Sequence, residues 1–293
     1  MFSAHDFAEI SPSSSYEYKE APCNEIAGEY PDHLKCLPSV MACCKALYRQ
    51  VREAYENEKF PVVIGGDHAL SIGSIAAGYE AFGDDLCIVW IDAHTDIHTD
   101  QSSESGYIHG MMLGTSMGLS CDELTAGKEK CRIKGENIFI IGARSIDDAE
   151  YEIIKQNKVN LYTADEIRER GMDAVMDEVK AKLKGKPLHI SLDVDFFDPS
   201  VFYATGYNIE KGFALDDAFR ITADLYSVAN PVIQEFVEYS PAKDTNSQDF
   251  IKLKKIMKHI LKYKTKLDSD TELSAVTANF QTGLGLKELR LGK

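Results

Sequence analysis

The sequence predicts an α/β protein in three layers, with a parallel sheet covered by helices on both faces. Short apolar runs of strand length alternate along the chain with longer segments whose apolar residues repeat at helical spacing. This alternation is typical of parallel sheets, because parallel strands are joined by crossovers that are usually helical. Potential metal ligands follow several of the apolar runs, and ligands of open sheets of this class bind at the carboxyl ends of the strands.

The first half of the chain is expected to contain two helices and three strands. Apolar residues recur at helical spacing over 39–58 and again over 70–82, where Gly83 ends the pattern. Apolar runs bounded by polar residues or glycine predict strands at 61–64, 86–91 and 137–141.

The second half continues the alternation up to residue 263. The same spacing predicts helices at 149–156, 172–183, 215–228 and 249–263, and apolar runs predict strands at 188–192 and 232–237. Residues 1–37 are polar and irregular, so we expect no strand there. We expect residues 1–265 to form a single α/β domain and residues 266–293 to form a loosely ordered C-terminal tail.

The composition is that of a soluble globular protein and excludes several classes of function. The net charge of −15 argues against a nucleic-acid partner and is compatible with a cationic substrate. No apolar run approaches the roughly 18 residues that a membrane span requires, and residues 1–18 lack the basic start and apolar core of a signal peptide. Seven cysteines, in no recognisable zinc-binding spacing, therefore predict reduced thiols in a cytoplasmic protein.

Three potential metal ligands follow the strand predicted at 86–91. Asp92, His94 and Asp96 occupy alternate positions, and alternate side chains of an extended backbone point the same way. Carboxylate oxygen and imidazole nitrogen together suit a divalent ion of intermediate hardness. The alternative interpretation is a polar loop that happens to follow a strand.

The other predicted strands repeat this arrangement, which favours the metal site. His68 follows the strand at 61–64, Asp193 and Asp195 follow the strand at 188–192, and Glu238 follows the strand at 232–237. Clustered aspartates repel one another and need a counter-charge. Two divalent cations balance the four aspartates, with His68 and His94 as neutral ligands. Such a two-metal centre can lower the pKa of a bridging water enough to supply hydroxide near neutral pH.

Three segments of the sequence resemble the signatures of the arginase/agmatinase (ureohydrolase) family. They are Gly65–Gly66–Asp67–His68, Asp92–Ala93–His94–Thr95–Asp96 and the run from Ser191 to Pro199. Residues 69–75, 105–111, 141–147 and 238–241 are similar to the bacterial arginase type within this family. The resemblance covers about residues 38–262 and implies an arginase-like fold. The family's first strand, with its glycine-rich loop, should precede this region, so we expect that strand to be missing or altered.

The resemblance implies a metallohydrolase with two Mn²⁺ per chain that converts L-arginine to L-ornithine and urea. One ion would be bound by His68, Asp92, Asp96 and Asp193, and the other by Asp92, His94, Asp193 and Asp195. A hydroxide that bridges the metals would attack the guanidinium carbon, held by a hydrogen bond to Asp96. Glu238 would pair with the guanidinium, and His109 would carry protons to the leaving amine or to the water.

The resemblance also implies where the far end of the substrate binds. Ser103 and Ser105 match positions that contact the α-carboxylate, and Asp147 and Glu150 match positions near the α-amino group. His98 stands where the family usually has an asparagine that contacts the carboxylate. The rim departs from the family pattern further at Tyr107, Tyr203 and Tyr207.

These departures leave three hypotheses open. The first is an arginase acting on a small cationic guanidino substrate, without nucleic-acid or membrane partners. The second is an agmatinase or another guanidino-compound ureohydrolase. The third is an inactive metal-binding homologue with a regulatory or structural role. The resemblance implies a homo-oligomer, either a trimer or a hexamer.

Overall fold

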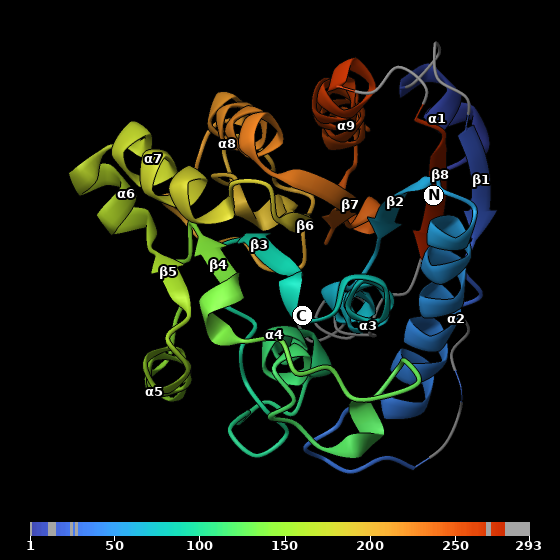
Figure 1. Cartoon of the computed structure of the whole chain (residues 1–293), viewed down its shortest axis with the longest axis vertical. Helices are drawn as coiled ribbons and strands as arrows, with labels where there is room; N and C mark the ends of the chain where they lie inside the picture. The colour runs from blue at the N-terminus through green and yellow to red at the C-terminus, as the bar shows by residue number, and fades with distance from the viewer. Residues whose placement is uncertain (1, 11–15, 24–25, 27–28, 268–270, 279–293) are drawn as a thin grey trace.

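The computed structural model describes residues 2–10, 16–23, 26, 29–267 and 271–278, and within them it forms one eight-stranded parallel sheet (Figure 1). The strands are β1 (Tyr16–Glu20), β2 (Phe60–Gly65), β3 (Cys87–Ile91), β4 (Ile138–Ile141), β5 (Asn160–Tyr162), β6 (Pro187–Asp193), β7 (Asn230–Val237) and β8 (Leu273–Ala278). Their order across the sheet is β1-β8-β2-β7-β6-β3-β4-β5, and every neighbouring pair is parallel. The predicted fold class is confirmed.

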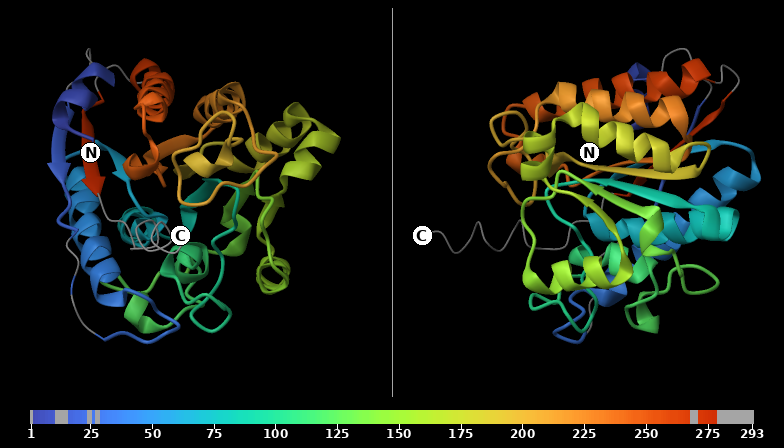
Figure 2. Two further views of the ribbon diagram at one scale, coloured as in Figure 1. Left: turned by 180° about the vertical axis from the view of Figure 1, so that it is seen from behind. Right: turned by 60° about the vertical axis from the view of Figure 1, so that its left-hand side comes forward.

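Helices cover both faces of the sheet, as Figure 2 shows. The helices are α1 (Ala4–Ile10), α2 (Leu37–Glu56), α3 (Ser71–Phe82), α4 (Met112–Ser116), α5 (Asp148–Asn157), α6 (Ala164–Arg170), α7 (Met172–Leu183), α8 (Leu215–Val228) and α9 (Gln248–Leu267). Helices α1, α6, α7, α8 and α9 pack into one hydrophobic core, and α2, α3, α4 and α5 pack into the other. Strands β2 and β3 are apolar throughout because both of their faces are buried.

The expectation of no strand in residues 1–37 and of a loosely ordered tail from residue 266 was wrong for the described parts of both segments. Strand β1 forms the sheet edge, and β8 inserts between β1 and β2 with all six of its residues buried. The sequence signal is weak because Tyr16–Glu20 alternates with charged residues and Leu273–Ala278 consists mostly of small residues. Neighbouring strands, rather than the local apolar pattern, provide the burial. The N-terminal segment thus holds a strand, but this strand pairs with β8, and residues 279–293 lie outside the described part of the chain.

The expectation of reduced thiols was also wrong for one pair of cysteines. Cys23, which follows β1, forms a disulfide with Cys43 on α2, with a Cα–Cα distance of 4.7 Å. Two cysteines so far apart in sequence are brought within bridging distance only when the N-terminal segment folds back onto α2. Among the described residues, no helix combines the length and the apolar character that crossing a bilayer requires.

Candidate active site

The candidate site lies at the carboxyl ends of four adjacent strands in the middle of the sheet. The sheet order places β2, β7, β6 and β3 side by side. His68 follows β2, Glu238 follows β7, Asp193 and Asp195 lie at the end of β6, and Asp92, His94 and Asp96 follow β3. Because the strands are parallel, their carboxyl ends lie on the same side of the sheet, and all of these residues meet there.

Local backbone structure aims several of these side chains. Asp67 and Asp193 cap the short 3₁₀ turns His68–Leu70 and Val194–Phe196. Their carboxylates accept hydrogen bonds from the backbone N–H groups of Ala69 and Asp195. Asp96 has a φ of 49° and Glu238 a φ of 64°, in the left-handed region that residues other than glycine seldom adopt. Such strain persists only where the surrounding structure enforces it, and it is frequent at functional sites.

The first cluster surrounds Nδ1 of His68. This nitrogen lies 3.1 Å from Oδ2 of Asp193, 3.2 Å from Oδ2 of Asp92 and 3.3 Å from Oδ2 of Asp96. All four side chains are buried, and Oδ2 of Asp92 accepts no hydrogen bond from the described residues. The structure thus brings together the four side chains predicted as ligands of one metal.

The second cluster surrounds Nδ1 of His94. It lies 2.9 Å from Oδ2 of Asp195 and 3.5 Å from Oδ1 of Asp92. His68, Asp92 and Asp193 could hold one ion, and Asp92, His94 and Asp195 could hold another. Asp92 therefore belongs to both groups, while Asp193 belongs to the first group only, so its bridging role stays a prediction.

The electrostatics of the two clusters favour cations. Burial and repulsion from Asp195 and Asp92 raise the pKa of Asp193 well above its usual value, and burial with repulsion from Asp92 raises the pKa of Asp96 to about 6. Burial would lower the pKa of His68, but the neighbouring carboxylates raise it well above the ordinary range. Carboxylate oxygens that repel one another, with imidazole nitrogens facing them, are a donor set that suits divalent cations. The residues therefore fit a two-metal centre.

Sequence reasoning missed two residues that support His68. The Trp90 ring stacks on the imidazole, with ring centroids 4.0 Å apart, and its Nε1 donates a hydrogen bond of 3.2 Å to Oδ2 of Asp96. Oγ of Ser191 lies 2.8 Å from Nε2 of His68. Such outer partners orient metal-binding histidines. Their signal was present in the sequence, because Trp90 precedes Asp92, and Ser191 precedes Asp193, by two positions along a strand.

A second polar group lies beside the clusters and consists of Glu238, His109 and Asp67. Glu238 accepts a hydrogen bond of 2.6 Å from the backbone N–H of His68, and burial with repulsion from Asp67 raises its pKa to about 7. Nδ1 of His109 lies 3.3 Å from Oδ2 of Asp67. Burial would lower the pKa of His109, but the Asp67 carboxylate raises it to about 9. Asp67 was overlooked as a functional residue although it belongs to the segment Gly65–His68.

One pocket of about 430 Å³ connects these groups to solvent. It is lined by His68, His94, Asp96, His98, Ser105, Tyr107, His109, Gly110, Ser145, Ile146, Asp147, Glu150, Asp193, Asp195, Tyr207, Ile209 and Glu238. The predicted far-end residues His98, Ser105, Asp147 and Glu150 therefore line the same pocket as the metal clusters. Ser103 does not line the pocket. Its hydroxyl lies 3.3 Å from the hydroxyl of Ser105 and accepts a hydrogen bond from the N–H of Gly106.

The predicted far-end residues are joined by hydrogen bonds. Nε2 of His98 lies 2.8 Å from Oδ2 of Asp147, and Nδ1 lies 3.0 Å from Oγ of Ser102. Asp147 and Glu150 form the capping box of α5, which fixes both carboxylates at the start of that helix. Glu150 also accepts a hydrogen bond of 2.5 Å from the Thr95 hydroxyl, which links this end to the metal-binding segment.

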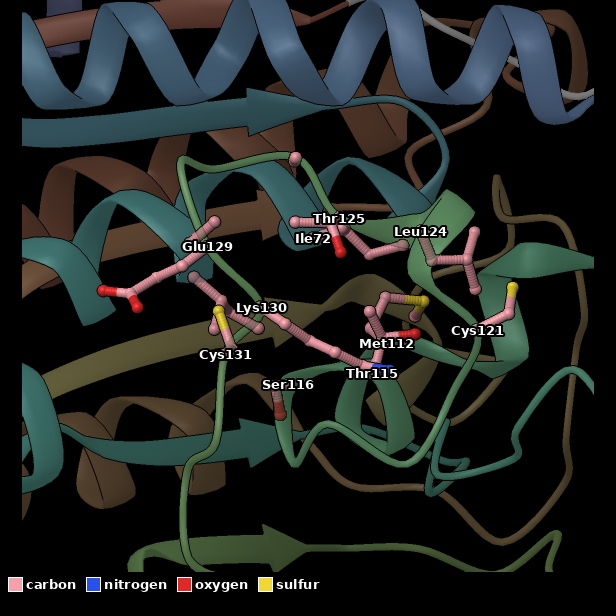
Figure 3. A pocket seen from close by; sticks show the side chains of 13 residues that line it. Ile72, Met112, Thr115, Ser116, Cys121, Leu124, Thr125, Glu129, Lys130 and Cys131 are labelled. Carbon is pink, nitrogen blue, oxygen red and sulfur yellow. The ribbon is translucent and has the colours of Figure 1, made fainter.

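A smaller hollow lies near α3 and α4 and is lined by residues such as Ile72, Met112 and Cys131 (Figure 3). Its volume is about 10 Å³, which is close to the space of a single water molecule. We regard it as a packing defect, not a ligand site.

Comparison with known proteins shows extensive similarity. A family profile described as the arginase family matches residues 5–261. Arginase from Bacillus subtilis is 36% identical over 227 residues, which cover 77% of this chain and 76% of that protein. A crystal structure of Bacillus subtilis arginase superposes with a TM-score of 0.76 at 33% identity over 82% of each chain. Entamoeba histolytica arginase in complex with L-ornithine superposes with a TM-score of 0.74 at 27% identity, over 81% of this chain and 82% of that one.

Proposed function

Because the chain belongs to the arginase family of ureohydrolases, we propose that it hydrolyses L-arginine to L-ornithine and urea. The observation that carries this proposal is that one pocket, of about 430 Å³, joins the metal-binding clusters to the polar residues at its other end. Agmatine is arginine without its α-carboxylate, so the choice between the two substrates depends on that other end. The complex of the Entamoeba arginase with L-ornithine, which keeps an amino-acid end, supports arginine as the substrate.

Glu238 would pair with the guanidinium of the substrate. Its half-buried carboxylate has a pKa raised to about 7 in the absence of substrate, and a guanidinium cation beside it would favour the ionised form. The resulting charge-assisted pair would hold the guanidinium carbon beside the metal clusters.

His109 would exchange the proton that the reaction moves. Hydrolysis breaks the bond between the guanidinium carbon and the substituted nitrogen, adds water to the carbon and requires a proton on the leaving amine. With Nδ1 facing Asp67, Nε2 is the ring nitrogen that remains to exchange a proton. A positioned side chain of this kind typically contributes about 10²–10⁴-fold to the rate.

The two clusters would hold two divalent ions, and we propose Mn²⁺ for both. His68, Asp92, Asp96 and Asp193 would hold the first ion, and Asp92, His94 and Asp195 the second, with Asp193 as a further bridge. Ions bound there would lower the pKa of water enough to provide the nucleophile near neutral pH. Asp96 would orient that nucleophile by a hydrogen bond. Oxygen-rich donor sets suit manganese, although zinc binds such sites more tightly by affinity order alone.

The far end of the pocket would bind the amino-acid part of arginine. Asp147 and Glu150 would receive the α-amino group, and the Ser105 hydroxyl would donate to the α-carboxylate, with Ser103 behind it. His98 already has partners at both ring nitrogens, so we propose that it acts mainly by holding Asp147 in place.

The test is the ratio of kcat/KM for L-arginine and agmatine, measured as urea released by the manganese-loaded protein. We expect a ratio above one, and Ser105→Ala should lower kcat/KM for arginine by about 10–100-fold, because a hydrogen bond to a charged group is lost. The same variant should leave kcat/KM for agmatine unchanged, which makes agmatine the internal control. A ratio below one would instead indicate an agmatinase, and no urea from either compound would indicate an inactive homologue. Assembly as a trimer or hexamer belongs to the same proposal, and light scattering would measure it.

A further inference from the structure

The ring of His109 is held on several sides by its neighbours. Nδ1 lies 3.3 Å from the Asp67 carboxylate. The Tyr107 ring lies nearly parallel to the imidazole, with centroids 5.4 Å apart and an interplanar angle of 17°. The Tyr207 ring meets the imidazole edge-on, with centroids 6.0 Å apart and an angle of 78°. The hydrogen bond fixes one atom of the ring, and the two aromatic contacts restrict its rotation.

Tyr107 is in turn held by the N-terminal segment. Nζ of Lys35 lies 4.2 Å from the centroid of the Tyr107 ring, a distance typical of a cation–π contact. The backbone N–H of Lys35 donates a hydrogen bond of 2.8 Å to the carbonyl of Gly106, and Lys35 and Tyr107 form a parallel β-bridge. The backbone and the side chain of Lys35 therefore both fix Tyr107.

Gly106 makes this close approach possible. Its φ is 71°, and a Cβ atom there would lie 2.1 Å from the carbonyl oxygen of Asp32. A residue with a side chain would push residues 32–35 away from the pocket rim. The contact between the N-terminal segment and Tyr107 thus depends on backbone packing as well as on the charge of Lys35.

We propose that Tyr107 is a positioning residue for His109 and that Lys35 holds the Tyr107 ring in place. This inference rests on the proposed function, in which His109 exchanges a proton with the leaving amine. Proton transfer requires the imidazole to be within hydrogen-bond reach of the reacting group, so a ring free to rotate spends less time in a productive orientation. The aromatic face of Tyr107, rather than its hydroxyl, would provide the effect.

Tyr107 also lines the pocket, so its role in positioning His109 must be distinguished from contact with the substrate. A residue that only contacts the substrate would change KM when replaced. A residue that orients the proton-transfer group would change kcat instead, and a small base from solution could partly replace the misplaced imidazole.

The experiment compares Tyr107→Asn with Tyr107→Phe in the manganese-loaded full chain. We expect Tyr107→Asn to lower kcat for L-arginine by about 3–10-fold, the factor that one aromatic contact provides, with little change in KM. Tyr107→Phe keeps the ring and should retain wild-type kcat. Added imidazole should raise kcat of Tyr107→Asn but not of the wild type.

Lys35→Met should also lower kcat, by a smaller factor, and it keeps the test available if Tyr107→Asn does not fold. Tyr151→Asn is the matched control, since Tyr151 is exposed on α5 and does not line the pocket.

A second readout does not depend on turnover. In the metal-free protein, where no paramagnetic Mn²⁺ broadens the resonances, the ¹H–¹³C signals of the His109 ring can be assigned with His109→Ala. These signals should shift in Tyr107→Asn and stay near their wild-type positions in Tyr107→Phe, because a parallel aromatic ring shifts nearby proton resonances. Unchanged His109 signals in Tyr107→Asn, or equal loss of kcat in the Asn and Phe variants, would overturn the positioning role. Absence of urea formation by the wild type would overturn the proposed function, and the ring signals distinguish that outcome from a failure of the positioning role alone.

Discussion

Replacing Trp90 with phenylalanine should weaken the binding of divalent cations while keeping the fold. Trp90 is fully buried, stacks on His68 and donates its Nε1 hydrogen to Asp96. Phenylalanine keeps an aromatic ring beside His68 but cannot donate the hydrogen bond. The substitution therefore tests mainly one interaction, between the indole N–H and a carboxylate that we assign to the first metal.

The expected loss follows from the strength of that hydrogen bond. A hydrogen bond to a charged group contributes about 1.5–3 kcal/mol, and each 1.4 kcal/mol corresponds to about tenfold in affinity. We therefore expect Trp90→Phe to weaken Mn²⁺ binding by about 10–100-fold, which agrees with the usual effect of removing an outer partner of a metal ligand. The smaller ring also leaves a cavity, which should lower the stability of the metal-free protein by about 1–3 kcal/mol.

Calorimetric titration of metal-stripped protein with MnCl₂ measures the affinity. In the wild type, the fluorescence of Trp90 provides a second measurement, because it is the single tryptophan of the chain and stacks on His68. Tyr226→Phe is the matched control, since it removes a buried hydroxyl that lies 3.3 Å from Oε1 of Gln234, away from the site. The control should lose about 1 kcal/mol of stability and bind Mn²⁺ normally. Equal Mn²⁺ affinity in Trp90→Phe and the wild type would refute the assignment of Asp96 as a supported metal ligand.

Three further predictions follow from the site and its surroundings. Asp193→Ala should abolish urea release because it removes a carboxylate of the first cluster. His109→Ala should retain measurable turnover, since proton transfer provides about 10²–10⁴-fold and buffer can substitute in part. Complete loss of urea release in both variants at normal metal content would contradict these roles. In metal-free protein, the pKa of Asp96 is raised to about 6. The stability linked to its protonation is therefore fully present below the pKa that Asp96 has in the unfolded chain and is lost as the pH rises through about 6. Thermal unfolding should show a lower Tm at pH 8 than at pH 5, and excess Mn²⁺ should remove most of the difference. Gly106→Ala should lower the free energy of unfolding by more than about 1 kcal/mol, because the residue has a positive φ and its Cβ would meet a backbone oxygen; denaturant unfolding measures this, and wild-type stability would contradict the close approach.

The sequence by itself determined the fold class and most of the internal elements. Helical spacing and apolar runs predicted α2, α3, α5, α7, α8 and α9 and the strands from β2 to β7 except β5. Periodicity is informative there because each element has a face, or two faces, that must be buried. The alternate spacing of Asp92, His94 and Asp96, and of Asp193 and Asp195, likewise indicated where potential ligands would gather, since residues after parallel strands emerge at one edge.

Only the tertiary structure decided which elements become neighbours. The insertion of β8 between β1 and β2 joins segments from opposite ends of the chain, and neither strand has an apolar pattern strong enough to be predicted alone. The same holds for the contacts of Asp67 with His109, of Trp90 with His68 and of Lys35 with Tyr107. Local periodicity specifies which side of an element is buried, but the partner on that side depends on the order of strands and on packing between residues distant in sequence.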